Sequence, residues 1–219
     1  MIFESTIQKA NLIMKLRSMG ISSKKVLSAI EKIPREIFLP SNFTDYAYEN
    51  NPLPIGFEQT ISQPYIVALM TESLSLKGNE VILEIGTGSG YQTSILSILS
   101  RRVYSIERHE FLKKKAEELL LKNFFKNVTC IFGDGSLGME NQAPFDRIIV
   151  SAAAEDIPQT LIKQLKYGGI MVLPVGFSKE EQTLIKVRKD SDQTHYEEIF
   201  KVRFVPLVEG SQNLSLIHI

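Results

Sequence analysis

The sequence predicts an α/β fold: a doubly wound, mostly parallel sheet with helices on both faces, a C-terminal antiparallel strand and an N-terminal helical extension. Short apolar strands alternate with helical patterns between residues 81 and 174, which is typical of parallel sheets built from βαβ units. The first strand, residues 81–85, is followed by three glycines at alternate positions, Gly86, Gly88 and Gly90, and then by a helical pattern. A strand, a glycine turn and a helix in this order form the first half of a nucleotide-binding unit.

The N-terminal third is predicted to be helical and then irregular. Residues 4–33 are expected to form two helices divided at Gly20, because apolar residues recur at helical spacing on both sides and two serines after the glycine are possible caps. Residues 35–57 are rich in proline and aromatic residues, so we expect them to pack against the core beside a site. A further helix is predicted over residues 64–76, with a proline in its first turn, where the missing N–H costs little.

Strand and helix patterns continue through the rest of the chain. A helix is expected from about residue 109 to residue 122, and another over residues 161–165, which a glycine pair ends. Two last strands, residues 182–188 and 197–205, are predicted to pair antiparallel across a polar turn. The other strands predicted after the glycine turn are residues 102–107, 128–132, 145–150 and 170–173.

Composition narrows the class of protein. The 219 residues include 25 basic and 25 acidic side chains, whereas a nucleic-acid binder normally shows a basic excess. One cysteine, Cys130, excludes a disulfide within the chain and fits a reducing compartment, and three isolated histidines do not suggest zinc. No segment approaches the ~20 apolar residues of a membrane span, and the N-terminus does not resemble a secretory signal. We therefore expect a soluble, cytoplasmic, metal-free protein, monomeric by default.

The glycine turn indicates the class of cofactor. Three glycines in five residues allow positive φ angles and remove the Cβ atoms that would keep a ligand from the backbone. A dinucleotide site needs a third small residue in G-x-G-x-x-G, and that position is Tyr91. The stretch E-I-G-T-G-S-G instead resembles motif I of the S-adenosylmethionine-dependent methyltransferases with a Rossmann-like fold. The resemblance implies that the glycines pass beside the amino-acid end of S-adenosyl-L-methionine. The cofactor-binding residues implied here are Glu84, Gly86, Thr87, Gly88, Ser89 and Gly90.

Two further acids follow the next strands. Glu107 ends the second strand, where a carboxylate can accept two hydrogen bonds from a ribose diol, although in isolation it would be a surface acid. Asp134, followed by Gly135, comes after the third strand, where the methyltransferase class places an acid facing the adenine ring. The alternative is an ordinary Gly-Asp-Gly turn. Because an acid is associated with each of three successive strands, we favour the cofactor-binding interpretation for Glu107, Asp134 and Gly135.

A proline-stiffened loop, residues 52–64, precedes the glycine turn. From the residues alone, Thr60 and Ser62 are expected to cap the helix that begins at Pro64. The stretch P-L-P-I-G-F-E-Q-T-I-S-Q-P, however, closely resembles the signature of the protein L-isoaspartate O-methyltransferase family, which repairs isomerised aspartate and deamidated asparagine. The resemblance covers nearly the whole chain and includes V-R-F-V-P-L at residues 202–207.

The resemblance implies transfer of a methyl group from S-adenosyl-L-methionine to the free α-carboxylate of L-isoaspartyl residues in damaged peptides and proteins. The pKa of a free α-carboxyl group is ordinarily about 3.5, so the acceptor is ionised at neutral pH and no general base is needed. The site must instead supply alignment and partial desolvation. The methyl ester then closes to a succinimide, whose hydrolysis returns some normal aspartate.

The family resemblance also implies particular residues at the acceptor site. Ser62 is the candidate catalytic residue, and Gln59 and Thr60 are expected beside the cofactor. For the 205–207 segment, the alternative is core packing and an edge strand stopped by proline. Many family members carry glycine where this chain has Glu58. The expected substrate-binding residues are Pro54, Ile55, Thr60, Ile61, Ser62, Val205, Pro206 and Leu207.

Two units are expected on this basis. Residues 1–78 form the helical extension with the substrate and active-site loop, and residues 79–219 form the cofactor-binding core with its C-terminal antiparallel strands. Two alternatives to repair stay open: a methyltransferase of the same fold that acts on a small molecule or an RNA base, and a cofactor-binding module whose acceptor site is lost. The tail after Gly210 matches no recognisable pattern.

Overall fold

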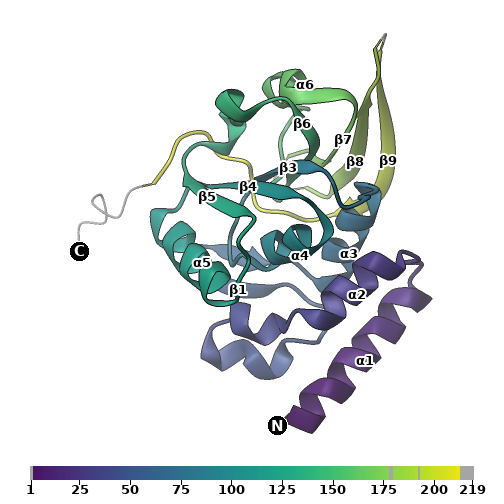
Figure 1. The fold of residues 1–219 in the computed structure, drawn as a ribbon, viewed down its shortest axis with the longest axis vertical. Helices are drawn as coiled ribbons and strands as arrows, with labels where there is room; N and C mark the ends of the chain where they lie inside the picture. The colour runs from purple at the N-terminus through teal and green to yellow at the C-terminus, as the bar shows by residue number, and fades with distance from the viewer. Residues whose placement is uncertain (1, 178–179, 192, 213–219) are drawn as a thin grey trace.

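A seven-stranded sheet forms the centre of the described chain (Figure 1). The computed structural model describes residues 2–177, 180–191 and 193–212. The strands are β3 (Val81–Ile85), β4 (Arg102–Glu107), β5 (Val128–Phe132), β6 (Phe145–Val150), β7 (Leu165–Val175), β8 (Gln182–Lys189) and β9 (Thr194–Val202). Their spatial order is β5-β4-β3-β6-β7-β8-β9. The first five in this order are parallel, β8 is antiparallel to β7, and β9 is antiparallel to β8. The predicted mostly parallel sheet with antiparallel C-terminal pairing is confirmed.

The order of the strands locates a binding crevice. β3 pairs with β4 on one side and with β6 on the other, so the chain builds the sheet first in one direction and then in the opposite one. In open α/β sheets, ligands bind at the carboxyl ends of the strands where this reversal occurs. The relevant ends are Ile85 of β3 and Val150 of β6.

Helices cover both faces of the sheet, as predicted. Neighbouring residues of β3 illustrate this, because successive side chains of a strand point to opposite faces. Ile82 belongs to an apolar cluster that includes Ile95, whereas Leu83 belongs to a second cluster with Leu161. Figure 1 shows α4 and α6 on different sides of the strands. The helices of the core are α3 (Pro64–Ser73), α4 (Tyr91–Leu99), α5 (Glu110–Lys122) and α6 (Gln159–Gln164).

Two helices form the N-terminal extension, α1 (Ile2–Ser18) and α2 (Lys24–Lys32), and they are separated at Gly20 as predicted. Gly20 has a φ of +99°, a conformation that suits glycine. The Ser23 hydroxyl caps α2 by accepting a hydrogen bond from the Val26 N–H at 3.3 Å. Glu72 of α3 accepts the Ser23 N–H at 2.5 Å, which ties the extension to the core.

The bounds of two C-terminal strands differ from the prediction. β7 begins at Leu165 and continues through Gly168 and Gly169, so these glycines do not end a helix. Leu165 pairs with β6 before a register irregularity, and Gly169 pairs with Lys189 of β8. β9 begins at Thr194, three residues earlier than predicted, and ends at Val202. The chain then leaves the sheet, so the segment around Val205 is not part of β9.

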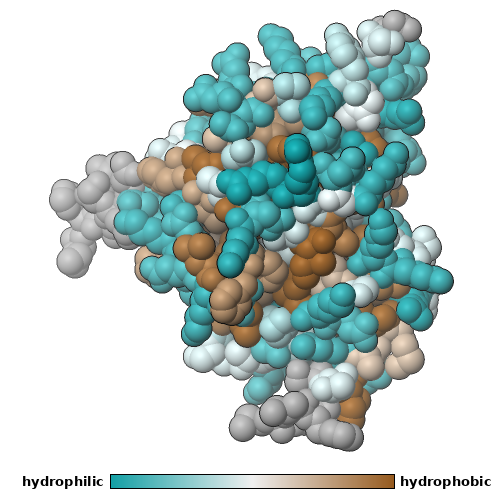
Figure 2. Space-filling view, viewed as in Figure 1, coloured by the Kyte–Doolittle hydropathy of each residue, from teal (hydrophilic) through white to brown (hydrophobic). Residues whose placement is uncertain are grey.

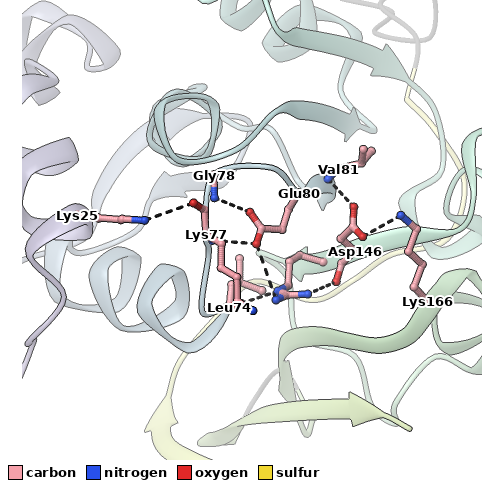
Figure 3. Close-up of polar contacts among 9 residues, drawn as sticks. Lys25, Leu74, Lys77, Gly78, Glu80, Val81, Asp146 and Lys166 are labelled. Atoms are coloured by element: carbon pink, nitrogen blue, oxygen red, sulfur yellow. Dashed lines mark hydrogen bonds and ion pairs between the residues drawn. The ribbon is translucent and has the colours of Figure 1, made fainter. Parts of the chain in front are cut away.

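Polar contacts hold together the amino-terminal ends of the central strands, at the end of the sheet opposite the crevice (Figure 3). Arg147 donates from Nε to the Leu74 carbonyl at 2.6 Å, and its Nη2 lies 4.0 Å from Oε1 of Glu80. Asp146 accepts the first N–H of β3 at 2.8 Å and pairs with Lys166 at 2.8 Å. These contacts join the end of α3 to the amino-terminal ends of β3, β6 and β7, and so support the crevice from the other side of the sheet.

The helices leave some apolar side chains on the surface. Figure 2 shows apolar side chains near the middle of the viewed face, surrounded by hydrophilic ones. Ile98 of α4 and Leu121 of α5 are among the exposed large apolar residues, which is ordinary for a protein surface. Within the described residues, no helix has the length and apolar character needed to cross a membrane.

Candidate cofactor and acceptor site

A cavity of about 750 Å³ lies at the carboxyl ends of β3 and β6. Three parts of the chain surround it: the glycine turn, the hairpin of β1 (Leu53–Gly56) and β2 (Gln59–Ile61) with the start of α3, and the segment 200–208. The predicted site residues on its wall are Gln59, Thr60, Ile61, Ser62, Gly86, Thr87, Gly88, Ser89, Glu107, Gly135, Val205, Pro206 and Leu207. One cavity therefore brings the glycine turn and the acceptor loop together.

The glycine turn has the backbone conformation that the sequence predicts. Gly86, Gly88 and Gly90 have φ angles of +91°, +53° and +88°, which other L-residues rarely adopt. A Cβ on Gly88 would lie 3.4 Å from Cδ1 of Ile55, so the hairpin packs closely against the turn. Gly90 itself lies behind the wall, where a Cβ would meet Ala116 of α5 at 3.3 Å.

Glu107 connects the turn to the cavity. The side chain is only 4% exposed, yet it lines the cavity. Its Oε2 accepts the Gly88 N–H at 2.8 Å and its Oε1 accepts the His109 N–H at 2.9 Å. Each oxygen has a further lone pair, since an ionised carboxylate can accept about four hydrogen bonds. Glu107 is therefore held in place and can still accept hydrogen bonds from a ligand.

Glu84 lies below the cavity wall and does not line it. It is fully buried, and its Oε2 accepts the hydroxyls of Thr93 and Ser105, each at 2.6 Å. Burial raises the pKa of Glu84 to about 7, and these two hydroxyl hydrogen bonds oppose the rise. The hydroxyls of Ser105 and Thr87 lie 2.6 Å apart. Since Ser105 gives its proton to Glu84, Thr87 donates to Ser105, and the Thr87 oxygen can accept a hydrogen bond from the cavity.

Asp134 also lies off the cavity wall. Its Oδ1 accepts the N–H and the hydroxyl of Ser136, at 2.8 and 2.7 Å, and its Oδ2 accepts the Gly210 N–H at 2.6 Å. Burial alone would raise the pKa of Asp134, but the hydrogen bonds from Gly210 and Ser136 outweigh it and hold the pKa below its ordinary value. The next residue, Gly135, lines the cavity, and a Cβ there would lie 2.3 Å from Cγ2 of Ile85. A residue with a Cβ at this position would require the Ile85 side chain to move.

The turn of the hairpin carries the residue that departs from the family pattern. Phe57 and Glu58 connect β1 to β2, and both have positive φ angles, 54° and 58°. For residues with a Cβ this conformation costs about 1–2 kcal/mol each. The Phe57 ring packs against His109 and Phe111, with ring centroids 5.6 and 5.4 Å apart, which holds the turn against the start of α5. Glu58, the other residue of this turn, lines the cavity.

Ser62 does not cap α3, so that interpretation is wrong. The N-cap of the helix is Gln63, which makes no side-chain capping bond, and Pro64 occupies the first position. Thr60 belongs to β2 and lies too early in the chain to cap the helix. In the described part of the chain, the Ser62 hydroxyl has no hydrogen-bond partner, while its carbonyl accepts from Arg35 at 3.1 Å. The hydroxyl is thus available to a ligand in the cavity.

The segment after β9 closes another side of the cavity. The Ala153 N–H donates to the Val205 carbonyl at 2.8 Å, and the Leu207 N–H donates to the Ala153 carbonyl at 2.7 Å. These bonds fix the segment beside the end of β6. Pro54 and Ile55 of the hairpin, in contrast, do not line the cavity, and Ile55 packs behind the glycine turn.

His109 is a cavity residue to which sequence reasoning assigned no role. It is 6% exposed and lines the cavity, and its Nε2 is buried without a partner among the described residues. Burial lowers the pKa of His109, and the nearby Glu107 opposes the shift, so the neutral imidazole dominates at pH 7. Its position two residues after Glu107 was the available signal.

The described part of the tail packs beside the cavity. The Gln212 N–H donates to the Arg108 carbonyl at 2.7 Å, and the Gln212 carbonyl accepts the Glu110 N–H at 3.3 Å. Gln212 also lines the cavity, so the tail to this residue borders the neighbouring site. Residues 213–219 lie outside the described residues.

Known proteins resemble this chain over nearly its full length. A relative from Roseobacter denitrificans named protein-L-isoaspartate O-methyltransferase is 52% identical over 203 residues, covering 93% of this chain and 95% of the relative. A relative of the same name from Dictyoglomus turgidum is 54% identical over 200 residues, covering 91% of this chain and 90% of the relative.

Solved structures with the same fold cover most of this chain. A protein-L-isoaspartate O-methyltransferase superposes with a TM-score of 0.82 at 28% identity, covering 90% of this chain and 65% of that chain. A Plasmodium falciparum structure in complex with S-adenosyl-L-homocysteine superposes with a TM-score of 0.79 at 24% identity, covering 90% and 97%. The family model described as protein-L-isoaspartate(D-aspartate) O-methyltransferase matches residues 7–212. The chain therefore belongs to the protein-L-isoaspartate(D-aspartate) O-methyltransferase family.

Proposed function

We propose that this chain is a protein-repair enzyme that transfers a methyl group from S-adenosyl-L-methionine to the free α-carboxylate of L-isoaspartyl residues in damaged peptides and proteins. The observation that carries this proposal is the single cavity shared by the glycine turn and the loop containing Ser62. Membership of the family supports the same reaction and substrate class.

The glycine-turn side of the cavity suits the cofactor. S-Adenosyl-L-methionine, when bound, supplies an electrophilic methyl group on a sulfonium centre. Glu107 has lone pairs that can accept a ribose diol, and the Nε2 of His109, which has no partner in the described part of the chain, can hydrogen-bond the nucleoside. The Thr87 oxygen can accept from the ammonium of the amino-acid end. Gly86, Gly88, Ser89 and Gln59 are proposed to complete this side, and Glu84 and Gly90 to support it from behind.

Asp134 and Gly135 are proposed at the base of the cofactor. The two oxygens of Asp134 already accept from Ser136 and Gly210, so an exocyclic amine must use a remaining lone pair. Gly135 lets the chain approach β3 closely and leaves the wall there without a side chain. We propose that Asp134 mainly shapes this turn and contacts the base at its edge.

The acceptor loop suits an anionic nucleophile. An isoaspartyl α-carboxylate is already ionised at pH 7, so the chain needs to position and desolvate it without removing a proton. We assign to Ser62 the hydrogen bond that orients this carboxylate, with Thr60 and Ile61 beside it. A carboxylate oxygen forms the new bond to the methyl carbon as the carbon–sulfur bond breaks, and the two opposite charges cancel.

The reactions of the methyl ester that follow need no residue of the enzyme. In the methyl ester, the neighbouring backbone nitrogen attacks the ester carbonyl and expels methanol, which forms a succinimide. Hydrolysis of that ring yields some L-aspartyl product, so repair proceeds by repeated cycles. Val205, Pro206 and Leu207 are proposed to hold the backbone of the damaged peptide across the cavity, and Pro54 and Ile55 to shape the hairpin that faces it.

The deciding experiment uses labelled S-adenosylmethionine with two peptides that differ only in an isoaspartyl or an aspartyl residue. Base-labile label on the isoaspartyl peptide alone is expected. Binding of the cofactor without transfer to either peptide would support a cofactor-binding module with a lost acceptor site. Transfer to a small molecule or an RNA base in place of the peptide would support the other alternative.

Replacing Ser62 with alanine is expected to lower kcat on the isoaspartyl peptide by about tenfold, the usual value of a hydrogen bond to a charged group. The affinity for S-adenosylhomocysteine should not change, because the hydroxyl faces the acceptor. Initial rates and calorimetry measure the two quantities. Ser191→Ala, in the exposed turn between β8 and β9, is the matched control. An unchanged kcat removes Ser62 from catalysis.

The proposal also covers the setting of the enzyme. A chain of zero net charge with a single buried cysteine fits a cytoplasmic monomer that acts on peptides and not on nucleic acid. The division into an acceptor-loop unit, residues 1–78, and a cofactor-binding core, residues 79–219, belongs to this proposal. Size-exclusion chromatography with light scattering tests the monomer, and a dimer peak would contradict it.

A further inference from the structure

Arg35 is a buried cation with no role in the reaction described so far. It opens the short helix η1 (Arg35–Phe38), and none of its surface is exposed. The guanidinium donates to three main-chain carbonyls: Nη1 to Ala47 at 2.6 Å, and Nη2 to Asn51 and Ser62, each at 3.1 Å. Within the described residues, no carboxylate forms an ion pair with it.

A buried guanidinium without a paired carboxylate lowers the stability of the folded protein, so its presence calls for a functional reason. Burying a charge without a counter-ion is costly, and an apolar side chain of similar volume would fill the space without that cost. Burial lowers the pKa of Arg35 to about 10, so the guanidinium stays charged at neutral pH. Among the described residues the Nε has no partner, and besides the carbonyls the Tyr91 ring, whose centroid lies 5.8 Å from Cζ, compensates part of the charge.

The partners of Arg35 are next to the cavity. Ser62 and Tyr91 both line it, so the guanidinium lies directly behind two residues of its wall. The loop that supplies the other carbonyls is itself tied to α3, because the Asn50 side chain accepts the Tyr65 N–H at 2.9 Å. Arg35 thus joins η1, the loop of residues 47–51 and the acceptor loop. One of its bonds fixes the carbonyl of Ser62.

We propose that Arg35 is a positioning residue for methyl transfer: it holds Ser62 through its carbonyl and places a fixed positive charge behind the site of the acceptor carboxylate. This inference deepens the proposed function and depends on it. In a buried, poorly screened region, a fixed charge acts more strongly on an anion than it would in water. The same cation therefore orients the hydroxyl and favours an ionised acceptor over a neutral one.

Two substitutions separate the two effects. Arg35→Lys keeps the charge but loses the planar fork that reaches several carbonyls at once. Arg35→Met keeps much of the volume and removes the charge. The readout is the affinity of the enzyme, loaded with S-adenosylhomocysteine so that no turnover occurs, for two peptides. One has the isoaspartyl α-carboxylate, and the other has a carboxamide in its place.

The wild-type enzyme should prefer the carboxylate peptide. In Arg35→Met this preference is expected to fall by about tenfold, and kcat with S-adenosylmethionine by more than tenfold, as for the loss of one favourable electrostatic contact. Arg35→Lys should retain the preference to within about threefold while kcat falls about tenfold, because charge is kept and geometry is lost. The affinity for S-adenosylhomocysteine should change less than about twofold in both variants, since Arg35 lies behind the acceptor side.

A purely structural role gives a different result. Equal weakening of both peptides and of S-adenosylhomocysteine, with the carboxylate preference intact in Arg35→Met, would overturn the inference. If Arg35→Met does not fold, Arg35→Lys decides alone: an unchanged kcat overturns the inference, and a lowered kcat with preference retained supports it. Arg188→Met, which removes an exposed guanidinium on β8 next to Asp190, is the matched control and should leave all three readouts unchanged. A wild-type enzyme that does not methylate the isoaspartyl peptide would instead contradict the proposed function.

Discussion

Glu84→Gln is expected to remove a loss of stability that the wild-type protein shows between about pH 4.5 and pH 7. The ordinary pKa of the side chain is 4.5, and burial raises it to about 7 in the folded protein. Below pH 4.5, Glu84 is protonated in both states. As the pH rises toward 7, the unfolded chain releases this proton while the folded protein keeps it, so unfolding becomes easier. The difference in pKa corresponds to roughly 3 kcal/mol.

Urea unfolding at pH 4.5, 6 and 8 measures this effect. The free energy of unfolding of the wild-type protein should fall relative to that of Glu84→Gln by up to about 3 kcal/mol across this range, and the gap should stay constant above pH 7. The amide oxygen of glutamine can still accept the hydroxyls of Thr93 and Ser105. Glu118→Gln, on the exposed face of α5, is the control. Parallel curves for the wild type and Glu84→Gln would contradict a raised pKa.

Glu107→Ala is expected to weaken the binding of S-adenosylhomocysteine by about 1.5–3 kcal/mol, the value of a lost hydrogen bond to a charged group. Three contacts disappear together, because the carboxylate faces the cavity and also accepts the Gly88 N–H at 2.8 Å and the His109 N–H at 2.9 Å. The loss should therefore lie toward the upper end of this range. Isothermal titration calorimetry measures the affinity, and urea unfolding of the same sample verifies that the variant is folded.

A control of equal charge makes the Glu107 result specific. Glu118→Ala removes a carboxylate that is exposed on α5, and its affinity for S-adenosylhomocysteine should equal that of the wild type. Equal affinity of Glu107→Ala and the wild-type protein would mean that the carboxylate serves the glycine turn alone. The ribose contact would then have to be assigned to another group.

The sheet could be predicted because its signal is local. Each core strand is a short apolar run, and each glycine of the turn has a positive φ that follows from its place between strand and helix. The predicted bounds of β7 and β9 were wrong because pairing with a neighbouring strand sets where these strands begin. Leu165 joins β7 because it pairs with Phe145, and Thr194 joins β9 because it pairs with Lys189, and neither pairing is visible along the chain.

The site was predictable only in part, for a similar reason. The family-specific proline loop pointed to Ser62, and the place of Glu107 at the end of the second predicted strand pointed to that carboxylate; both residues line one cavity. A capping role for Ser62 was the expectation from position alone, and it was wrong because Gln63, one residue later, occupies the N-cap position before α3 begins at Pro64. The neighbours of these residues come from distant parts of the chain, as with the hydrogen bond from Arg35 to the Ser62 carbonyl, and no local pattern encodes such contacts.

By itself, the sequence determined the order of strands and helices, the class of cofactor and the family, because spacing and motif are properties of neighbouring residues. Only the tertiary structure decided which side chains share an environment. It buries Glu84 so that its pKa rises, and it joins Asp134 to Gly210 by a hydrogen bond. It also places Arg35 behind Ser62 with no carboxylate paired to it among the described residues. Burial and long-range hydrogen bonds depend on how distant segments pack, and they set the charge and the geometry on which the reaction depends.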